Sequence, residues 1–183
     1  MNRILLLTLL ILTLITSSAF AATKNLYENS YNGYRITLPA GWTANPDMIG
    51  KADFVAYSPS GSCGIAVNVE PTPSGYFHKY SLDNDFPKEL ADLLTPEYTT
   101  KLQKRRPYMD LKNTQFIRVA GKKALSIDYA HPTINGHQAA KWQSIILFTE
   151  SKGYFIQFMG PENEYDANYT YFLDALKSFK LLS

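Results

Sequence analysis

The sequence predicts an α+β fold: a single domain in which helices cover an antiparallel sheet. Between residues 33 and 159, most segments are short stretches with apolar residues at alternate positions, joined by turn residues, as in antiparallel strands. One helical stretch interrupts these strands and a second follows them, so helices can cover the sheet. With 183 residues, 45% of them hydrophobic, the chain has the material for one substantial core.

The stretch from Ala139 to Met159 predicts the central hairpin of the sheet. Its first arm carries large apolar residues on both faces, which is typical of a strand inside a sheet covered on both sides. Residues 150–153 predict the turn, with Gly153 at a positive φ, and residues 154–159 return antiparallel. We interpret this hairpin as scaffold.

Further strands are predicted before and after this hairpin. Residues 22–32 are polar and predict a flexible lead-in. Residues 34–38 alternate, with Tyr34, Ile36 and Leu38 facing inward, and residues 54–57 and 65–69 predict a hairpin. A second hairpin is predicted from residues 112–119 and 123–130, with a tight turn around Gly121, and a last strand from residues 179–182.

Two regions are predicted to be helical. In the first, Asn84 or Asp85 is a candidate N-cap and Pro96 starts a second segment, so we expect two short helices or one broken helix. The second region lies near the C-terminus, where Glu162 and Glu164 precede it and complement the helix dipole. Its apolar face carries Tyr165, Tyr169, Phe172, Leu173 and Leu176.

A basic cluster ends the first helical region: Lys101, Lys104, Arg105 and Arg106. Cations at a helix C-terminus complement the macrodipole, so a solvated helix end is our main interpretation. The alternative is contact with an anionic surface, either lipid or a polyanion.

The first 21 residues predict a signal peptide. Arg3 gives a short positive region, residues 4–16 are apolar, and the small-x-small pattern at residues 19–21 predicts cleavage after Ala21. A retained anchor is the alternative, but the apolar stretch would span only ~20 Å of a ~30 Å hydrocarbon layer. We therefore expect a periplasmic or secreted protein with no stable membrane anchor after cleavage.

Charge and cysteine content argue against several functions. The formal net charge of +2 is close to neutral, whereas nucleic-acid binders need a basic face, so we expect no nucleic-acid partner. Cys63 is the one cysteine and can form no internal disulfide. Its neighbours superficially resemble those of a thiol-protease nucleophile, but the aromatic residue expected after it is absent. We expect a buried or idle thiol, with a reactive one as the alternative.

Residues 33–42, GYRITLPAGW, resemble the opening of the PsbP and DcrB-like families, in which a strand is followed by Pro, Gly and Trp. Residues 121–124 (GKKA) before a tyrosine-bearing strand, and the terminal helix followed by Ser178 and Phe179, are similar to the second half of these families. The resemblance covers residues 31–182. It implies the α/β/α sandwich of PsbP and Mog for a domain at residues 33–183.

The resemblance implies a non-enzymatic role. PsbP-like proteins are extrinsic subunits that dock on a membrane complex, and DcrB-like proteins are envelope lipoproteins or, in cytoplasmic relatives, chaperones for apolar helices. This chain departs from the lipoproteins because no cysteine follows its leader, and from the chaperones because it carries an export signal. We expect an accessory or binding protein without a cofactor, docking on an envelope or membrane-complex protein.

Three histidines are the side chains most able to act near neutral pH: His78, His131 and His137. None belongs to an HExxH motif, and no GxSxG motif is present. His131 and His137 flank one loop beside Asp128, so the alternative function is a small-ligand or metal-binding protein, or an undetected hydrolase, that uses this loop. Partner binding remains the main hypothesis, because no catalytic set is found and 13 tyrosines suit an interface.

Overall fold

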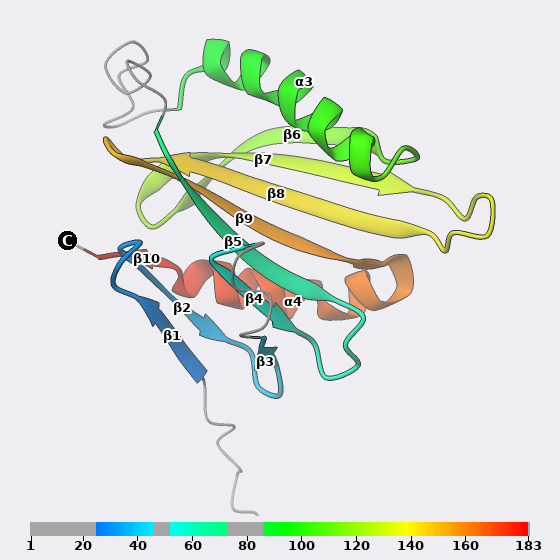
Figure 1. Cartoon of the computed structure of the whole chain (residues 1–183), viewed down its shortest axis with the longest axis horizontal. Helices are drawn as coiled ribbons and strands as arrows, with labels where there is room; N and C mark the ends of the chain where they lie inside the picture. The colour runs from blue at the N-terminus through cyan, green and yellow to red at the C-terminus, as the bar shows by residue number, and fades with distance from the viewer. Residues whose placement is uncertain (1–24, 46–51, 73–85, 183) are drawn as a thin grey trace, which may run out of the picture.

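The computed structural model describes residues 25–45, 52–72 and 86–182, and these form three layers (Figure 1). Helix α3 (Lys88–Arg105) covers one face of a seven-stranded sheet, and helix α4 (Glu162–Ser178) covers the other face together with a small three-stranded sheet. Every strand pair is antiparallel. The predicted α+β class, with helices covering an antiparallel sheet, is confirmed.

The large sheet has the strand order β3-β4-β5-β9-β8-β7-β6. The predicted central hairpin is confirmed, because β8 and β9 pair along their whole length and β9 lies in the middle of the sheet. The bounds are β3 Thr43–Ala44, β4 Phe54–Tyr57, β5 Gly64–Pro71, β6 Asp110–Val119, β7 Lys122–His131, β8 Ala140–Phe148 and β9 Lys152–Pro161.

The turn between β8 and β9 differs from the prediction. Gly153 lies within β9 and is not at a positive φ. The turn closes earlier, where the Thr149 N–H donates to the Lys152 carbonyl over 2.7 Å. A Cβ at Gly153 would lie 2.8 Å from Cε1 of Phe148, so close packing explains the glycine.

The small sheet has the order β1-β2-β10, formed by Asn25–Asn29, Tyr34–Leu38 and Lys180–Leu181. The predicted flexible lead-in is therefore wrong for residues 25–29, because they pair with β2 along five residues. The predicted inward face of β2 is confirmed, since Tyr34, Ile36 and Leu38 are buried in the core. Residues 22–24 and the predicted cleavage site lie outside the described residues.

Helix α3 is continuous over 18 residues, so the expectation of two short helices or a broken helix is wrong. Pro96 lies inside the helix and removes one backbone donor. The helix continues across it because both sides pack against the sheet: Leu90 and Leu94 before Pro96 are buried, and Leu102 after it packs partly buried against the same core. The predicted caps Asn84 and Asp85 lie outside the described residues, and the described helix begins after Pro87.

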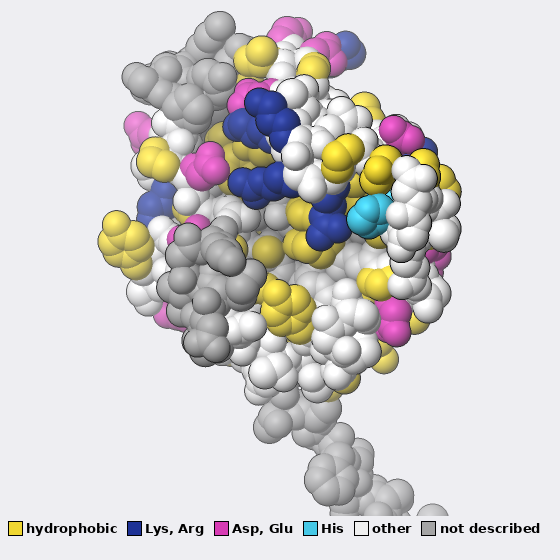
Figure 2. Space-filling view, turned by 45° about the vertical axis from the view of Figure 1, so that its right-hand side comes forward, with side chains coloured by type: hydrophobic (Ala, Val, Ile, Leu, Met, Phe, Trp, Pro, Cys, Tyr) yellow, Lys and Arg dark blue, Asp and Glu magenta, His cyan; other side chains and the backbone are white. Residues whose placement is uncertain are grey.

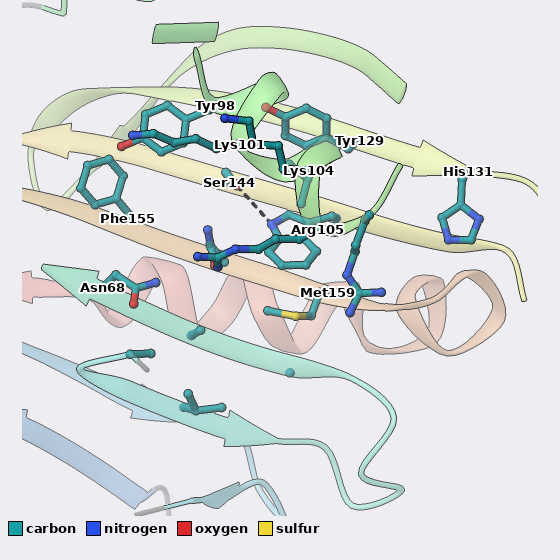
Figure 3. Close-up of a pocket in the computed structure, with 18 of the residues that line it drawn as sticks. Asn68, Tyr98, Lys101, Lys104, Arg105, Tyr129, His131, Ser144, Phe155 and Met159 are labelled. Atoms are coloured by element: carbon teal, nitrogen blue, oxygen red, sulfur yellow. Dashed lines mark hydrogen bonds between the residues drawn. The ribbon is translucent and has the colours of Figure 1, made fainter. Parts of the chain in front are cut away.

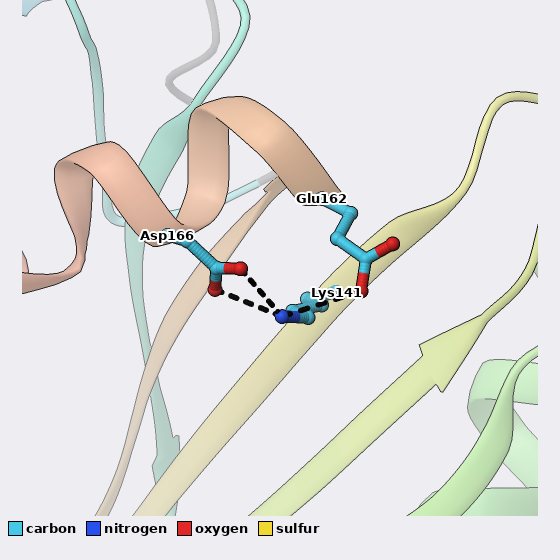
Figure 4. Close-up of polar contacts among 3 residues, drawn as sticks. All are labelled: Lys141, Glu162 and Asp166. Carbon is cyan, nitrogen blue, oxygen red and sulfur yellow. Dashed lines mark hydrogen bonds and ion pairs between the residues drawn. The ribbon is translucent and has the colours of Figure 1, made fainter.

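Helix α4 is fixed to the sheet by an ion-pair cluster at its first turn (Figure 4). The Nζ of Lys141 on β8 lies 2.8 Å from both carboxylate oxygens of Asp166 and 3.3 Å from Oε1 of Glu162. Phe158 on β9 and Phe172 on α4 stack with ring centroids 4.8 Å apart. Polar and aromatic contacts together set the position of this layer.

Alternation along each strand divides the apolar residues between two cores. On β9, Tyr154, Ile156 and Phe158 face α4 and the small sheet, whereas Phe155 faces α3. The α3 core draws on β7, β8 and β9 and includes no residue of β4 or β5. The α3-side face of β4 and β5 is therefore left to line a groove. Among the described residues, no helix is long and apolar enough to cross a membrane.

Candidate functional site

A groove of about 1000 Å³ lies between the C-terminal half of α3 and the face of the large sheet (Figure 3). Its floor comes from β4, β5, β9, β8 and β7, and its upper wall comes from α3 and the residues that follow it. Pockets of ~300–1000 Å³ are typical of ligand sites. This groove is at the upper end of that range.

Strand register arranges the floor in rows across the sheet. One row contains Asn68, Phe155 and Ile146, the next Ala66, Gln157 and Ser144, and the third Gly64, Met159 and Trp142. Neighbouring rows are two residues apart along each strand, ~6.6 Å. The β5 positions are small in two rows, Gly64 and Ala66, which deepens the groove on that side.

Two side-chain amides on this floor have unused hydrogen-bonding capacity. Asn68 and Gln157 line the groove and are half-buried. Neither side chain makes a hydrogen bond to another residue within the described parts of the chain. An amide of this kind can donate to and accept from a bound molecule.

The basic cluster that ends α3 lies along the groove: Lys101, Lys104, Arg105 and Arg106 all line it. Figure 2 shows Lys and Arg side chains beside a hollow with an apolar interior. Lys101 is paired with Glu97, at 2.7 Å. Within residues 25–45, 52–72 and 86–182, no carboxylate forms an ion pair with Lys104, Arg105 or Arg106. All four side chains are exposed, as the interpretation of a solvated helix end expects, and they also lie along a concave surface.

Aromatic residues connect α3 to the floor. The rings of Tyr98 on α3 and Phe155 on β9 have centroids 5.3 Å apart. The guanidinium of Arg106 lies over the ring of Trp142, whose indole N–H donates to Oγ of Ser144 over 3.2 Å. Burial raises the pKa of the Tyr129 hydroxyl on β7, another part of the floor, so this phenol stays protonated.

The predicted histidine-loop residues are only partly brought together. His131 and His137 both line the groove. His131 is buried and its Nδ1 lies 2.7 Å from the Pro132 carbonyl, while the ring of His137 lies 5.5 Å from that of Tyr108. His78 is outside the described residues.

Asp128, the third candidate of that site, lies on the opposite face of the sheet. It is three residues before His131 on β7, so alternation separates the two side chains. Its Oδ1 accepts a hydrogen bond from Nε2 of Gln143 over 2.8 Å. Among the described residues, no group of three or more His, Cys, Asp or Glu side chains could hold a metal ion. A site that combines Asp128 with His131 and His137 therefore does not form.

Cys63 is fully buried, in agreement with the expected buried thiol. Burial, and in smaller part the charge of Glu164, raises the pKa of the thiol to about 11. The thiol therefore remains protonated at neutral pH and lacks the thiolate that a nucleophile needs.

Sequence reasoning missed the groove itself. The signal was present on β5, where Gly64, Ala66 and Asn68 alternate with the larger apolar residues of the other face. A face of small and polar residues next to a long basic helix end indicates an incompletely covered sheet. Pairing this pattern with the basic cluster would have located the groove.

No family model matches the sequence, and no curated protein matches it. Solved structures do match its fold. A cyanobacterial PsbP, CyanoP from Synechocystis sp. PCC 6803, has a TM-score of 0.63 at 14% identity over 90% of this chain and 96% of its own. The Saccharomyces cerevisiae Ran-binding protein Mog1p has a TM-score of 0.58 at 10% identity over 89% of this chain and 97% of its own.

LpqN, involved in cell envelope biogenesis of Mycobacterium tuberculosis, has a TM-score of 0.55 at 8% identity, over 89% of this chain and 87% of its own. At these identities the likeness concerns the fold. The chain thus has the α+β fold found in PsbP and Mog1, as the resemblance of its sequence motifs implies.

Proposed function

We propose that this chain is an exported, non-enzymatic accessory protein of the cell envelope that docks on a protein partner through the groove beside α3. The observation that carries the proposal is the combination of uncompensated cations, free amides and aromatic side chains in one concave surface. Arginine and aromatic residues are enriched in protein interfaces. They also supply most of the strongest individual contacts there.

The comparisons and the sequence support the same class of function. Mog1p is a Ran-binding protein, and LpqN is involved in cell envelope biogenesis. The predicted leader at residues 1–21 supports export. The buried, protonated thiol of Cys63 supports a non-enzymatic role, because it lacks the thiolate of a nucleophile, and so does the separation of Asp128 from His131 on opposite faces of the sheet.

Site-specific photo-cross-linking in the protein's own envelope fraction tests the proposal. The photoreactive amino acid benzoylphenylalanine replaces Gln157 on the groove floor or, as a control, Tyr171 on the exposed side of α4. We expect a reproducible protein adduct from position 157 and none of the same mass from position 171. Equal adducts from both positions, or none from position 157, would contradict docking in the groove.

A small-ligand function in the same groove is the second candidate. It is favoured by the volume of about 1000 Å³ and by the two histidines, His131 and His137, at one end. Thermal melts with anionic metabolite mixtures and divalent metals test it. Ligand at ~100 Kd should add about 2.7 kcal/mol to the free energy of unfolding. Replacing both histidines by Ala should remove that shift under this candidate and leave partner cross-linking unchanged under the first.

A further inference from the structure

We propose that the groove binds an extended, acidic segment of the partner, with carboxylates toward α3 and apolar side chains on the sheet floor. This inference rests on the proposed function and specifies the chemistry of the partner. Three features of the groove carry it: its charge, its length and the hydrogen-bonding groups on its floor.

Charge complementarity selects an anionic occupant. Lys104, Arg105 and Arg106 contribute three positive charges along one wall, and within the described part of the chain no carboxylate pairs with them. Among the lining residues that the structure describes, Glu70 is the one carboxylate, and it lies at the far end of β5. A partner with carboxylates near the end of α3 would gain charge-assisted hydrogen bonds, and a basic partner would be repelled.

The length of the floor suits a short stretch of extended chain. From Gly64 to Glu70, β5 advances six residues, ~20 Å, at about 3.3 Å per residue. An extended segment of about six residues spans the same distance. Its alternate side chains would meet the floor rows, in which Phe155 and Met159 offer apolar contacts on either side of Gln157.

The free amides distinguish a peptide from a lipid chain. Asn68 and Gln157 lie on adjacent rows of the floor. A peptide backbone presents an N–H and a C=O at every residue, so both amides can be satisfied when water is displaced. A hydrocarbon tail would desolvate the same amides without replacing their hydrogen bonds, which is unfavourable.

Selection from a displayed library of random eight-residue peptides tests the inference. The bait is the chain from residue 22 to 183, and an Ala66→Phe variant, whose new ring would enter the groove, serves for counter-selection. We expect the selected peptides to be rich in Asp and Glu with interspersed aromatic or aliphatic residues. We further expect a representative peptide to bind at least tenfold more weakly when its acids are changed to amides.

Two variants locate the contacts. Lys104→Glu with Arg105→Glu should weaken the selected peptide at least tenfold, whereas Lys177→Glu with Lys180→Glu, which makes the same charge change on exposed residues of α4 and β10, should leave its affinity unchanged. Circular dichroism checks that each variant is folded.

The remaining outcomes would overturn the inference. One is selection of peptides that carry no excess of acidic residues. Another is failure to enrich any peptide over the Ala66→Phe bait. The third is co-sedimentation of the protein with phosphatidylglycerol vesicles when no peptide is selected. A groove-specific protein adduct from position 157 combined with any of these results would leave the proposed function standing and reject the acidic peptide. Absence of the adduct would reject the proposed function itself.

Discussion

The guanidinium carbon of Arg106 lies 5.5 Å from the centroid of the Trp142 ring, so the C-cap of α3 is held over the floor of the groove. The backbone fixes the same corner, because the Arg106 N–H donates to the Leu102 carbonyl and the Met109 N–H donates to the Arg106 carbonyl. The side chain of Gln103 adds a hydrogen bond to the Met109 carbonyl over 2.9 Å. The basic wall is therefore anchored to the sheet.

This contact predicts a coupling between the two residues. Arg106→Ala should lower the free energy of unfolding by ~0.5–1 kcal/mol, the range of a partly exposed cation–π contact. In a double-mutant cycle with Trp142→Leu, measured by urea denaturation, the loss from Arg106→Ala should shrink when Trp142 is absent. Strictly additive losses would show that the contact contributes nothing to stability.

The buried thiol of Cys63 predicts slow labelling and a specific pH dependence. In the native protein at pH 8, a thiol reagent should leave Cys63 unreacted, and in denaturant it should titrate one thiol per chain. Because the folded-state pKa, about 11, is above the unfolded value, the stabilising effect is complete below the unfolded pKa and is lost as pH rises toward 11.

The measurement is the difference in free energy of unfolding between the wild type and Cys63→Ala at several pH values from 7 to 10.5. Above about pH 8.5, the free energy of unfolding of the wild type should fall relative to that of Cys63→Ala, by no more than ~1.4 kcal/mol per pH unit. A difference that is constant over this range would contradict the raised pKa.

Gly160 on β9 leaves space for the sulfur of Cys63, the residue just before β5, because a Cβ at position 160 would overlap Sγ of Cys63. Gly160→Ala should therefore cost ~1–3 kcal/mol of unfolding free energy through overpacking. The same substitution in a Cys63→Ala background should cost less, since Sγ is gone. Chemical denaturation of the four proteins gives both numbers, and an equal cost in both backgrounds would show that the sulfur is not the obstacle.

Lys141 predicts a loss of stability in alkali. Hydrogen bonding to Asp166, followed by contact with Glu162, raises the pKa of its ammonium group. Its contribution is complete below the unfolded pKa of about 10.4 and is lost as pH rises through the higher folded value. Because both carboxylates are largely exposed, removing the pair by Lys141→Met should cost only ~1 kcal/mol or less at pH 7.

Comparing the wild type with Lys141→Met at pH 7 and pH 11 separates this effect from the titration of tyrosines, which both proteins share. The difference in free energy of unfolding between the two proteins should be smaller at pH 11 than at pH 7, and it should also be smaller at high salt. A gap that widens in alkali would contradict the raised pKa.

The alternation of apolar and polar residues was enough to predict the strands whose burial follows that pattern. Alternation placed Tyr34, Ile36 and Leu38 correctly, and the two-sided apolar character of residues 142–148 identified β8 as a strand inside the sheet. The predicted flexible lead-in was wrong because residues 25–29 pair with β2 and because the ring of Tyr27 packs against the core beside Phe54. The helix break predicted at Pro96 was wrong for a similar reason, because packing of α3 against the sheet overrides a local helix breaker.

The candidate site was harder to predict because it depends on which face each residue occupies. Asp128 and His131 are close in sequence, yet three steps along a strand put them on opposite sides of the sheet. Conversely, the basic end of α3 and the amide of Gln157 are about 50 residues apart in sequence, yet both line the groove. Packing of α3 on the sheet brings the first there, and the register of β9 with β5 and β8 brings the second.

The most direct test of the groove as the docking surface measures the affinity of the cross-linked partner, once purified, by calorimetry. The wild type is compared with Lys104→Glu/Arg105→Glu and with the matched control Lys177→Glu/Lys180→Glu. The proposed docking mode predicts at least a tenfold loss of affinity for the first variant and no change for the control. Equal affinity for all three proteins would contradict it.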